Sequence, residues 1–299
     1  MISIIICARN QDIPGELRKN IGETIGVDYE IIVIDNSENR LNIFTAYNMG
    51  VERSKYPLLL FMHDDIHYHT SEWGRRVLAH FKDEKVGAIG VAGGPYVPSV
   101  PGGWWSTGAG HLYLLQSARR GDEPVLQNYF PAGSSAREVV VLDGVWFCIR
   151  RTLFDTIRFD DKTFSGFHLY DLDISMQVFR AGYKLLSIND ILIHHFSSGV
   201  LDGKWISNLL IFHKKWKPYL PASVTHFTLS QQCAMEYRVL NEFMSNRILN
   251  LPTGETKSRV YLSGLRDLLS FRKGLLYFKT PFWGVKIFGK YVRSLVGKN

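Results

Sequence analysis

The sequence predicts an α/β domain with a mostly parallel sheet flanked by helices, followed by a helical carboxyl-terminal appendage. Apolar, strand-like runs alternate with helical patterns near the amino terminus, an order typical of parallel sheets, whose strands are joined by helical crossovers. These runs end in polar residues, and the strand ends of an open α/β sheet are where its ligand binds. With 299 residues, 45% of them hydrophobic, the chain can bury a substantial core.

Three strands and two helices are expected in order from the amino terminus. The strands are residues 2–7, 30–34 and 58–62, and the helices are residues 17–25 and 41–53. The polar residues after the three strands are, in order, Arg9 and Asn10, then Asp35 and Asn36, then His63, Asp64 and Asp65. Because the carboxyl ends of parallel strands meet at one edge, these residues should form a polar rim of nucleotide size.

The triplet His63, Asp64 and Asp65 concentrates charge at the tip of an apolar strand. Acids in such a place need compensation from a metal, a basic residue or water. Acids after a strand also commonly cap the next helix. The triplet alone therefore leaves a divalent metal site and a helix cap as open interpretations.

The middle of the chain contains further candidate residues. Residues 92–110 are rich in glycine and proline and are expected to form an irregular, mobile loop. Trp104 and Trp105 within it either stack on a sugar or base, or fix the loop to the core. The apolar run 139–149 is interrupted by Asp143 and Gly144, and a glycine inside a strand marks a bulge or a close backbone approach. Asp143 then either faces a ligand or lies in a solvated turn.

Two later segments carry acids and imidazoles. Asp171 and Asp173 begin a predicted helix, where acids interact favourably with the helix dipole. With His168 and Tyr170 just before it, such a carboxylate can take a proton from an incoming hydroxyl. The short apolar strand 191–193 ends in His194 and His195, either of which can complete a metal coordination sphere.

Charge and cysteine usage give expectations about location. Seven Lys or Arg and no acid lie in residues 272–299, which leaves 28 basic and 28 acidic residues elsewhere. Because aromatic residues are interleaved with these charges, residues 271–299 are predicted to be a membrane-surface helix that binds anionic lipid. A helix packed on its own domain and a nucleic-acid patch are the alternatives, and no nucleic-acid partner is expected.

Three well-separated cysteines without CxxC spacing indicate a reducing compartment. The amino terminus shows no signal-peptide pattern, and no apolar run reaches the length of a spanning helix. The protein is therefore expected in the cytoplasm, peripheral at the inner face of the cell membrane. An oligomer is compatible with the sequence.

Seven segments in order resemble the family 2 glycosyltransferases, inverting enzymes of the GT-A fold. They are IIICARN, EIIVIDNSEN, AYNMG, FMHDDIHY, LDGVWFCIRR, FHLYDLDISMQVFRAGYK and IHHFSSG. The resemblance covers about residues 1–216 and implies a nucleotide-diphosphate sugar donor, with uridine or thymidine as the base. The expected division is a GT-A domain over residues 1–220 and a helical appendage over residues 221–299.

The resemblance also implies roles for individual residues. Those implied to bind the nucleotide sugar are Cys7, Ala8, Arg9, Asn10, Asp35, Asn48 and Asp64. The DxD triplet of the family falls on residues 63–65 in an HxD form, which implies Mn²⁺ or Mg²⁺ on Asp65 and His63, with His194 or His195 as the late histidine that reaches the metal. Asp171 matches the catalytic base, and Tyr170 stands where the family has a further acid. The expected acceptor or sugar pocket is Trp104, Trp105, Asp143, Gly144, His168 and Tyr170.

These parts predict metal-assisted, single-displacement transfer of a sugar to a hydroxyl of a glycan or lipid-linked glycan. A sugar nucleotidyltransferase is the first alternative, although it needs a glycine-rich loop after the first strand, where this chain reads CARNQD. A non-catalytic nucleotide-sugar-binding protein of the membrane surface is the second. Such a protein has no need of acids at several strand ends.

Overall fold

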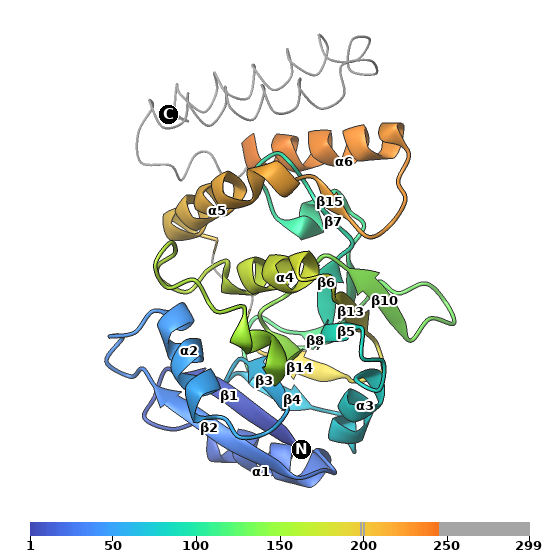
Figure 1. The fold of residues 1–299 in the computed structure, drawn as a ribbon. Coiled ribbons are helices and arrows are strands. Elements are labelled where there is room, and N and C mark those ends of the chain that lie inside the picture. Colours follow the sequence, from blue (N-terminus) through green and yellow to red (C-terminus); the bar gives the residue numbers. More distant parts are fainter. Residues whose placement is uncertain (198, 200, 245–299) are drawn as a thin grey trace. The chain divides into compact units, whose positions relative to one another are not determined.

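The computed structural model describes residues 1–197, 199 and 201–244 (Figure 1). The chain divides into two compact units, each described here by itself. The first comprises residues 1–95 and 110–199, and the second comprises residues 96–109 together with the chain from residue 200 onward. The second unit thus begins 20 residues before the expected boundary at residue 220 and also includes a segment from the middle of the chain.

A mixed seven-stranded sheet forms the centre of the first unit. Its strands are β1 (Ile2–Ala8), β2 (Tyr29–Asp35), β3 (Leu58–Met62), β5 (Val86–Gly90), β10 (Ala136–Val139), β12 (Trp146–Arg150) and β13 (Lys184–Ile188). Their order is β10-β13-β5-β12-β3-β1-β2. β1 pairs in parallel with both β2 and β3, so the three expected strands are neighbours and their polar ends meet at one edge.

The first unit also contains a second sheet, of six strands. Its strands are β4 (Ile66–Tyr68), β6 (Ala92–Gly94), β8 (His111–Gln116), β9 (Val125–Asn128), β11 (Val141–Leu142) and β14 (Ile193–His195). The order is β11-β6-β8-β14-β4, and β9 pairs with β8. The expected strand 191–193 therefore lies two residues further along and includes His194 and His195, because it pairs with both β4 and β8.

The expectation that residues 92–110 lack regular structure is wrong. They contain β6, β7 (Tyr96–Val97) and the 3₁₀ helix η1 (Trp104–Thr107), and β8 begins directly after them. A Cβ on Gly93 would lie 2.5 Å from the carbonyl oxygen of Val141, so glycine there allows β6 to pair closely with β11. The glycine content reflects this close approach as well as turns.

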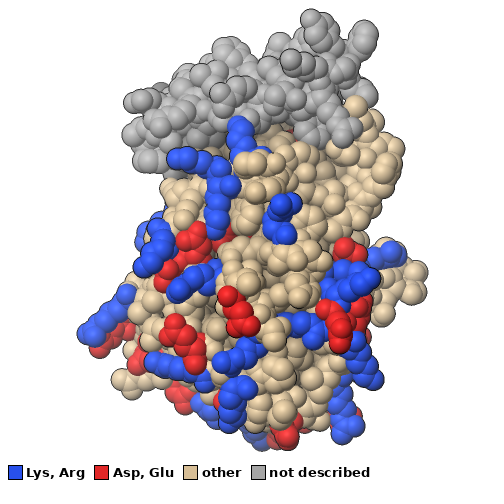
Figure 2. All heavy atoms as spheres, in the orientation of Figure 1, with Lys and Arg blue, Asp and Glu red and all other residues tan. Residues whose placement is uncertain are grey.

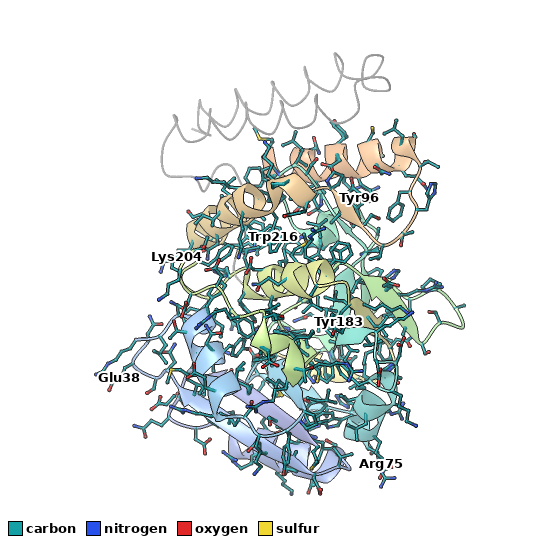
Figure 3. All side chains as sticks on the ribbon, viewed as in Figure 1. Glu38, Arg75, Tyr96, Tyr183, Lys204 and Trp216 are labelled. Atoms are coloured by element: carbon teal, nitrogen blue, oxygen red, sulfur yellow. The ribbon has the colours of Figure 1, made fainter. Side chains whose placement is uncertain are left out.

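Helices cover the sheets of the first unit, as expected from the sequence. They are α1 (Gly15–Thr24), α2 (Ile43–Arg53), α3 (Trp73–His80), α4 (Tyr170–Arg180) and the 3₁₀ helix η2 (Arg151–Asp155). The side chain of Asn42 caps α2 by accepting a hydrogen bond from the backbone N–H of Thr45. Polar side chains lie outside: Glu38, after β2, and Arg75, on α3, point away from the unit (Figure 3).

An aromatic core lies where α2 and α4 pack on the seven-stranded sheet. The ring of Tyr47 on α2 contacts those of Phe61 on β3, Tyr170 on α4 and Phe159 in the loop between η2 and α4. The ring centroids are 4.9 to 5.4 Å apart. Full burial of each large apolar side chain contributes about 1.5–3 kcal/mol. This packing fixes the start of α4, and so Tyr170 and Asp171, against the ends of the central strands.

The second unit is built on helices. Its described elements are β7, η1, α5 (Gly203–Trp216), the 3₁₀ helix η3 (Lys217–Tyr219), β15 (Ala222–Ser223) and α6 (Leu229–Glu242). The fully buried Glu236 of α6 accepts hydrogen bonds from the backbone N–H groups of Ser99 and Val100 and from the hydroxyl of Tyr96. These bonds attach the 96–109 segment to α6.

Two expectations concern the carboxyl-terminal part of the chain. The appendage expected to be helical over residues 221–299 contains α6, which Thr228 caps. The basic segment 271–299 lies outside the described residues. Among the described helices, none has both the length and the apolar character needed to cross a membrane. On the face of the first unit shown in Figure 2, acidic and basic side chains are interspersed.

Candidate active site

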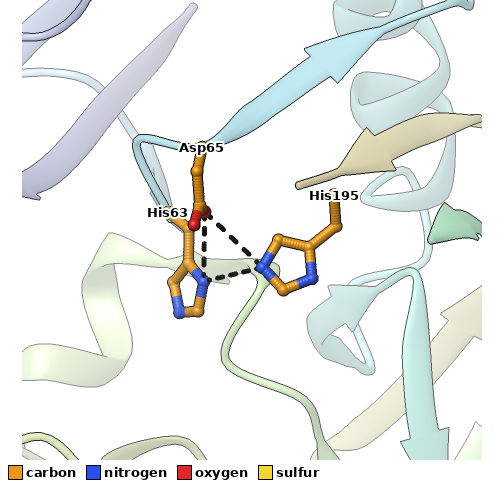
Figure 4. A group of neighbouring side chains, drawn as sticks. All are labelled: His63, Asp65 and His195. Atoms are coloured by element: carbon orange, nitrogen blue, oxygen red, sulfur yellow. Dashed lines mark hydrogen bonds and ion pairs between the residues drawn. The ribbon is translucent and has the colours of Figure 1, made fainter. Parts of the chain in front are cut away.

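Three side chains from two segments of the chain, residues 63–65 and the end of β14, converge in the first unit (Figure 4). His63 Nδ1 lies 3.3 Å from His195 Nε2, and Asp65 Oδ1 lies 3.7 Å and 3.5 Å from these two nitrogens. Among the described residues, this is the one group of three or more His, Cys, Asp or Glu side chains close enough together to hold a metal ion. The structure thereby selects His195 over His194, whose Nε2 instead lies 2.9 Å from the Ser117 hydroxyl.

Strand pairing explains how these residues meet. β3 ends at Met62, and the backbone N–H of His63 donates to the carbonyl oxygen of Val145, just before β12. The β4–β14 register places His195 opposite Ile66, and the N–H of Phe196 donates to the carbonyl oxygen of Asp65. His194 and His195 project to opposite faces because successive strand residues alternate.

The three inward atoms fit a divalent cation. Asp65 Oδ1 is buried and, among the described residues, has no hydrogen-bond partner, an unfavourable state for a carboxylate oxygen. A point equidistant from the three atoms lies about 2 Å from each, a usual length for metal–nitrogen and metal–oxygen bonds. Burial and the neighbouring His195 lower the pKa of His63, which favours the neutral ring that a metal requires.

Arg9 connects the first strand to the acids after the third. Its Nη2 lies 3.1 Å from Asp64 Oδ1 and 3.0 Å from Asp65 Oδ2, so Asp65 offers one oxygen to Arg9 and the other to the histidines. Burial alone would raise the pKa of Asp65, but His195, His63 and Arg9 outweigh that effect and lower it. The Arg9 side chain is 73% exposed and so remains accessible to an anionic ligand.

Asp171 has the opposite environment. Its Oδ2 accepts a hydrogen bond of 2.8 Å from the backbone N–H of Gly144, in the turn between β11 and β12. Burial, followed by the negative charge of Asp143, raises the pKa of Asp171 to about 7. A carboxyl with this pKa is suited to accept a proton near neutral pH. Asp143 itself accepts from the N–H of Val145 in the same turn.

Gly144 and Tyr170 connect the His63–Asp65–His195 group with Asp171. The Tyr170 hydroxyl donates to the carbonyl oxygen of Gly144 at 3.1 Å and lies 3.2 Å from His63 Nε2. A Cβ on Gly144 would lie 2.2 Å from the Tyr170 hydroxyl oxygen and 3.2 Å from Asp171 Oδ2, so the close backbone approach expected here is present. Tyr170 is buried, and its hydroxyl faces His63 of the candidate metal site. Its expected place in an acceptor or sugar pocket stays a prediction. His168 lies in the turn before α4.

Most residues implied to bind the nucleotide lie at the edge of the sheet, but Asn48 is buried away from it. Ala8 ends β1, partly exposed Cys7 precedes it, and exposed Asn10 follows it. Asp35, at the end of β2, is exposed and accepts from the N–H of Ser37. Asn48 is buried, and its amide pairs with both backbone groups of Phe159, which makes it a clamp between α2 and that loop. The first set surrounds the sheet edge, and Asn48 does not reach it.

Trp104 and Trp105 belong to the second unit. Trp104 is buried, and the ring of Trp105 lies 5.8 Å from that of Trp205 on α5. These contacts favour the interpretation that the tryptophans fix their segment to the core of that unit.

Sequence reasoning missed Gln116 and Ser197. Gln116 Oε1 lies 3.2 Å from His195 Nδ1, and the Ser197 hydroxyl lies 3.0 Å from His195 Nε2. Gln116 ends β8, which runs parallel to β14. The rule that polar residues follow strands at the ligand edge could have found it, since Gln116 follows the apolar run of β8.

Comparisons with known proteins identify the family and the fold. A family model described as "Glycosyltransferase like family" matches residues 3–195. The structure of S. aureus TarS 1–349 in complex with UDP-GlcNAc is 13% identical, with a TM-score of 0.54, over 97% of this chain and 89% of that one. Its complex with UDP is 11% identical, with a TM-score of 0.52, over 97% and 88%. These likenesses show the GT-A fold, and no curated protein matches the chain significantly.

Proposed function

The chain belongs to the glycosyltransferase-like family, and on this premise we propose that it transfers a sugar from a nucleotide-diphosphate sugar to an acceptor hydroxyl. The observation that carries this proposal is the pairing, within one unit, of a metal-compatible triad with a carboxyl whose pKa is about 7. The similar TarS structure holds UDP-GlcNAc, which supports uridine among the candidate bases and makes a UDP-sugar the first donor to test.

His63, Asp65 and His195 would hold Mn²⁺ or Mg²⁺ through the three atoms that converge in Figure 4. When bound there, the divalent ion supplies positive charge that offsets the charge developing on the nucleotide diphosphate. Arg9 supports the same ligand, since its exposed guanidinium lies beside Asp64 and Asp65 and can donate to phosphate oxygens. Asp35, at the neighbouring strand end, is proposed to bind the ribose or base.

Asp171 is proposed as the base. It would accept the proton of the acceptor hydroxyl as that oxygen attacks the anomeric carbon from the face opposite the diphosphate, which inverts the configuration. The N–H of Gly144 orients the carboxylate by donating to Oδ2. General-base assistance of this kind is typically worth 10² to 10⁴ in rate.

The acceptor is proposed to be a glycan or a lipid-linked glycan, with the protein held at the inner face of the cell membrane through residues 271–299. The support is the basic, aromatic composition of that segment, in which each charge near an anionic surface contributes about 1 kcal/mol. Lys286→Glu combined with Lys290→Glu should reduce sedimentation with anionic liposomes and leave neutral liposomes unaffected. Equal sedimentation of variant and native protein would argue against this proposal.

Thermal unfolding with a panel of nucleoside diphosphates and nucleotide sugars, with and without Mn²⁺, tests the donor proposal. A ligand at a hundredfold excess over its Kd stabilises the folded protein by about 2.7 kcal/mol. We expect a shift that depends on the metal and favours uridine or thymidine nucleotides. The matched control is Asp65→Asn, in which the metal should no longer enhance the shift. Absence of any shift in the native protein would contradict nucleotide-sugar binding.

A further inference from the structure

The outer nitrogens of the two imidazoles in the triad are each bonded to a neutral side chain. His63 Nε2 faces the Tyr170 hydroxyl at 3.2 Å, and His195 Nδ1 faces Gln116 Oε1 at 3.2 Å. A neutral imidazole has one proton, so the nitrogen that donates outward leaves a lone pair on the other nitrogen. Which nitrogen carries the proton follows from what Tyr170 and Gln116 can offer.

Tyr170 can offer only a lone pair to His63. Its single hydroxyl proton is directed to the carbonyl oxygen of Gly144 at 3.1 Å, and a carbonyl oxygen cannot donate. The proton of the His63–Tyr170 hydrogen bond therefore belongs to His63 Nε2, and the lone pair of His63 is on Nδ1, which faces Asp65 and His195.

Gln116 is oriented by carbonyl groups at its other end. Its Nε2 lies 3.2 Å from the carbonyl oxygen of Ser117 and 3.3 Å from that of His195, and it also contacts the carbonyl oxygen of Ser197. Since carbonyl oxygens only accept, the amide NH₂ must be at this end and Oε1 must face His195. His195 then carries its proton on Nδ1 and directs the lone pair of Nε2 toward Asp65. The Ser197 hydroxyl can rotate its proton away from Nε2.

We propose that Tyr170 and Gln116 are positioning residues that fix the two histidine tautomers so that three lone pairs face the metal position. The inference rests on the metal site of the proposed function. Without these contacts, either ring could turn a proton toward Asp65 and occupy the position with a hydrogen bond. Outer partners of this kind typically change metal affinity by 10- to 100-fold. Through Gly144, Tyr170 also connects His63 to the loop that orients Asp171.

Two measurements on the full-length, metal-free protein test the proposal. Long-range ¹H–¹⁵N correlation spectra of ¹⁵N-histidine-labelled protein identify the tautomer of each ring, with His63→Gln and His195→Gln variants for assignment. Titration with Mn²⁺ alone gives its affinity. The variants are Tyr170→Phe and Gln116→Met. The matched control is Tyr68→Phe, because the buried Tyr68 hydroxyl accepts from Trp146 Nε1 and donates to Met62 without contacting the triad.

We expect His63 protonated on Nε2 and His195 protonated on Nδ1 in the native protein. Tyr170→Phe and Gln116→Met should each mix the tautomers of the ring they contact and weaken Mn²⁺ binding by 10- to 100-fold. Tyr68→Phe should change neither. Unchanged tautomers and affinity in both variants would refute the positioning role alone. Native protein that shows the assigned tautomers but no Mn²⁺ binding would refute the metal site of the proposed function, and with it the purpose of these contacts.

Discussion

Asp65 and Asp171 are two carboxylates of one folded unit, and their surroundings act on them in opposite directions. Asp65 has Arg9 and two imidazoles beside it, and its pKa is lowered. Asp171 has Asp143 as its charged neighbour, and burial together with that charge raises its pKa to about 7. Environments that separate the pKa values of paired carboxyls assign them different tasks. The first environment suits a cation and the second suits a proton.

The largest expected effect comes from removing the proposed proton acceptor. Asp171→Asn keeps the size of the side chain but cannot accept the proton, so the transfer rate should fall by about 10² to 10⁴. Metal-dependent nucleotide binding should be unchanged, as measured by thermal shift on the same preparation. A variant with the native rate would remove Asp171 from the role of base.

Replacement of Asp65 tests whether this carboxylate binds the cation. Asp65→Asn removes a charged ligand, and Mn²⁺ affinity should fall by more than about 100-fold, beyond the effect typical of an outer partner. The pH dependence of any residual transfer should be retained, because the surroundings of Asp171 are intact. Titration with Mn²⁺ and a rate profile at saturating metal provide the two readouts. Native affinity in this variant would mean that the triad does not hold the ion.

Gly144→Ala should affect both regions at once. The new Cβ would lie 2.2 Å from the Tyr170 hydroxyl oxygen and near Asp171 Oδ2, so both side chains must move. Overpacking of this kind usually costs about 1–3 kcal/mol of stability. We expect a 10- to 100-fold loss in metal affinity, as for other outer-partner changes, together with a reduced transfer rate. Gly15→Ala, whose Cβ meets no atom within 4 Å, is the control and should change neither property.

The sequence predicted the parts of the site that depend on strand ends. β1, β2 and β3 were recognisable because continuous apolar runs alternate with helical patterns, and Asp65 follows the third run directly. The choice between His194 and His195 was not predictable, because it depends on the register of β14 against β4, where His195 pairs with Ile66, 129 positions earlier in the sequence. No local pattern shows this pairing. The strand-end rule could mark Gln116 as a candidate, but its contact with His195 was not predictable, because that contact arises only when β8 and β14 pair.

For residues 92–110 the sequence-based prediction of an irregular loop was wrong. Their glycines and prolines predicted an irregular loop, but close pairing of β6 with β11 requires glycine, and Glu236 orders the following residues by bonding to Ser99 and Val100. Both causes lie far away in the sequence. Local composition could not distinguish a glycine needed for a turn from one needed for tight packing.

The smallest expected effect concerns the pH dependence of transfer. Asp171 acts as a base only when ionised, so kcat/KM should fall about tenfold per pH unit below a pKa of about 7 and level off above it. Asp143 disfavours that ionisation by its negative charge; Asp143→Asn should therefore lower the pKa of Asp171 and extend activity to lower pH, while the plateau rate stays close to native. Rate profiles of the two proteins at saturating Mn²⁺ measure the shift. A midpoint that does not move would mean that burial alone sets the pKa of Asp171, and the contrast with Asp65 would then be one of solvation and not of neighbouring charge. A midpoint that moves to higher pH would contradict the role given to Asp143.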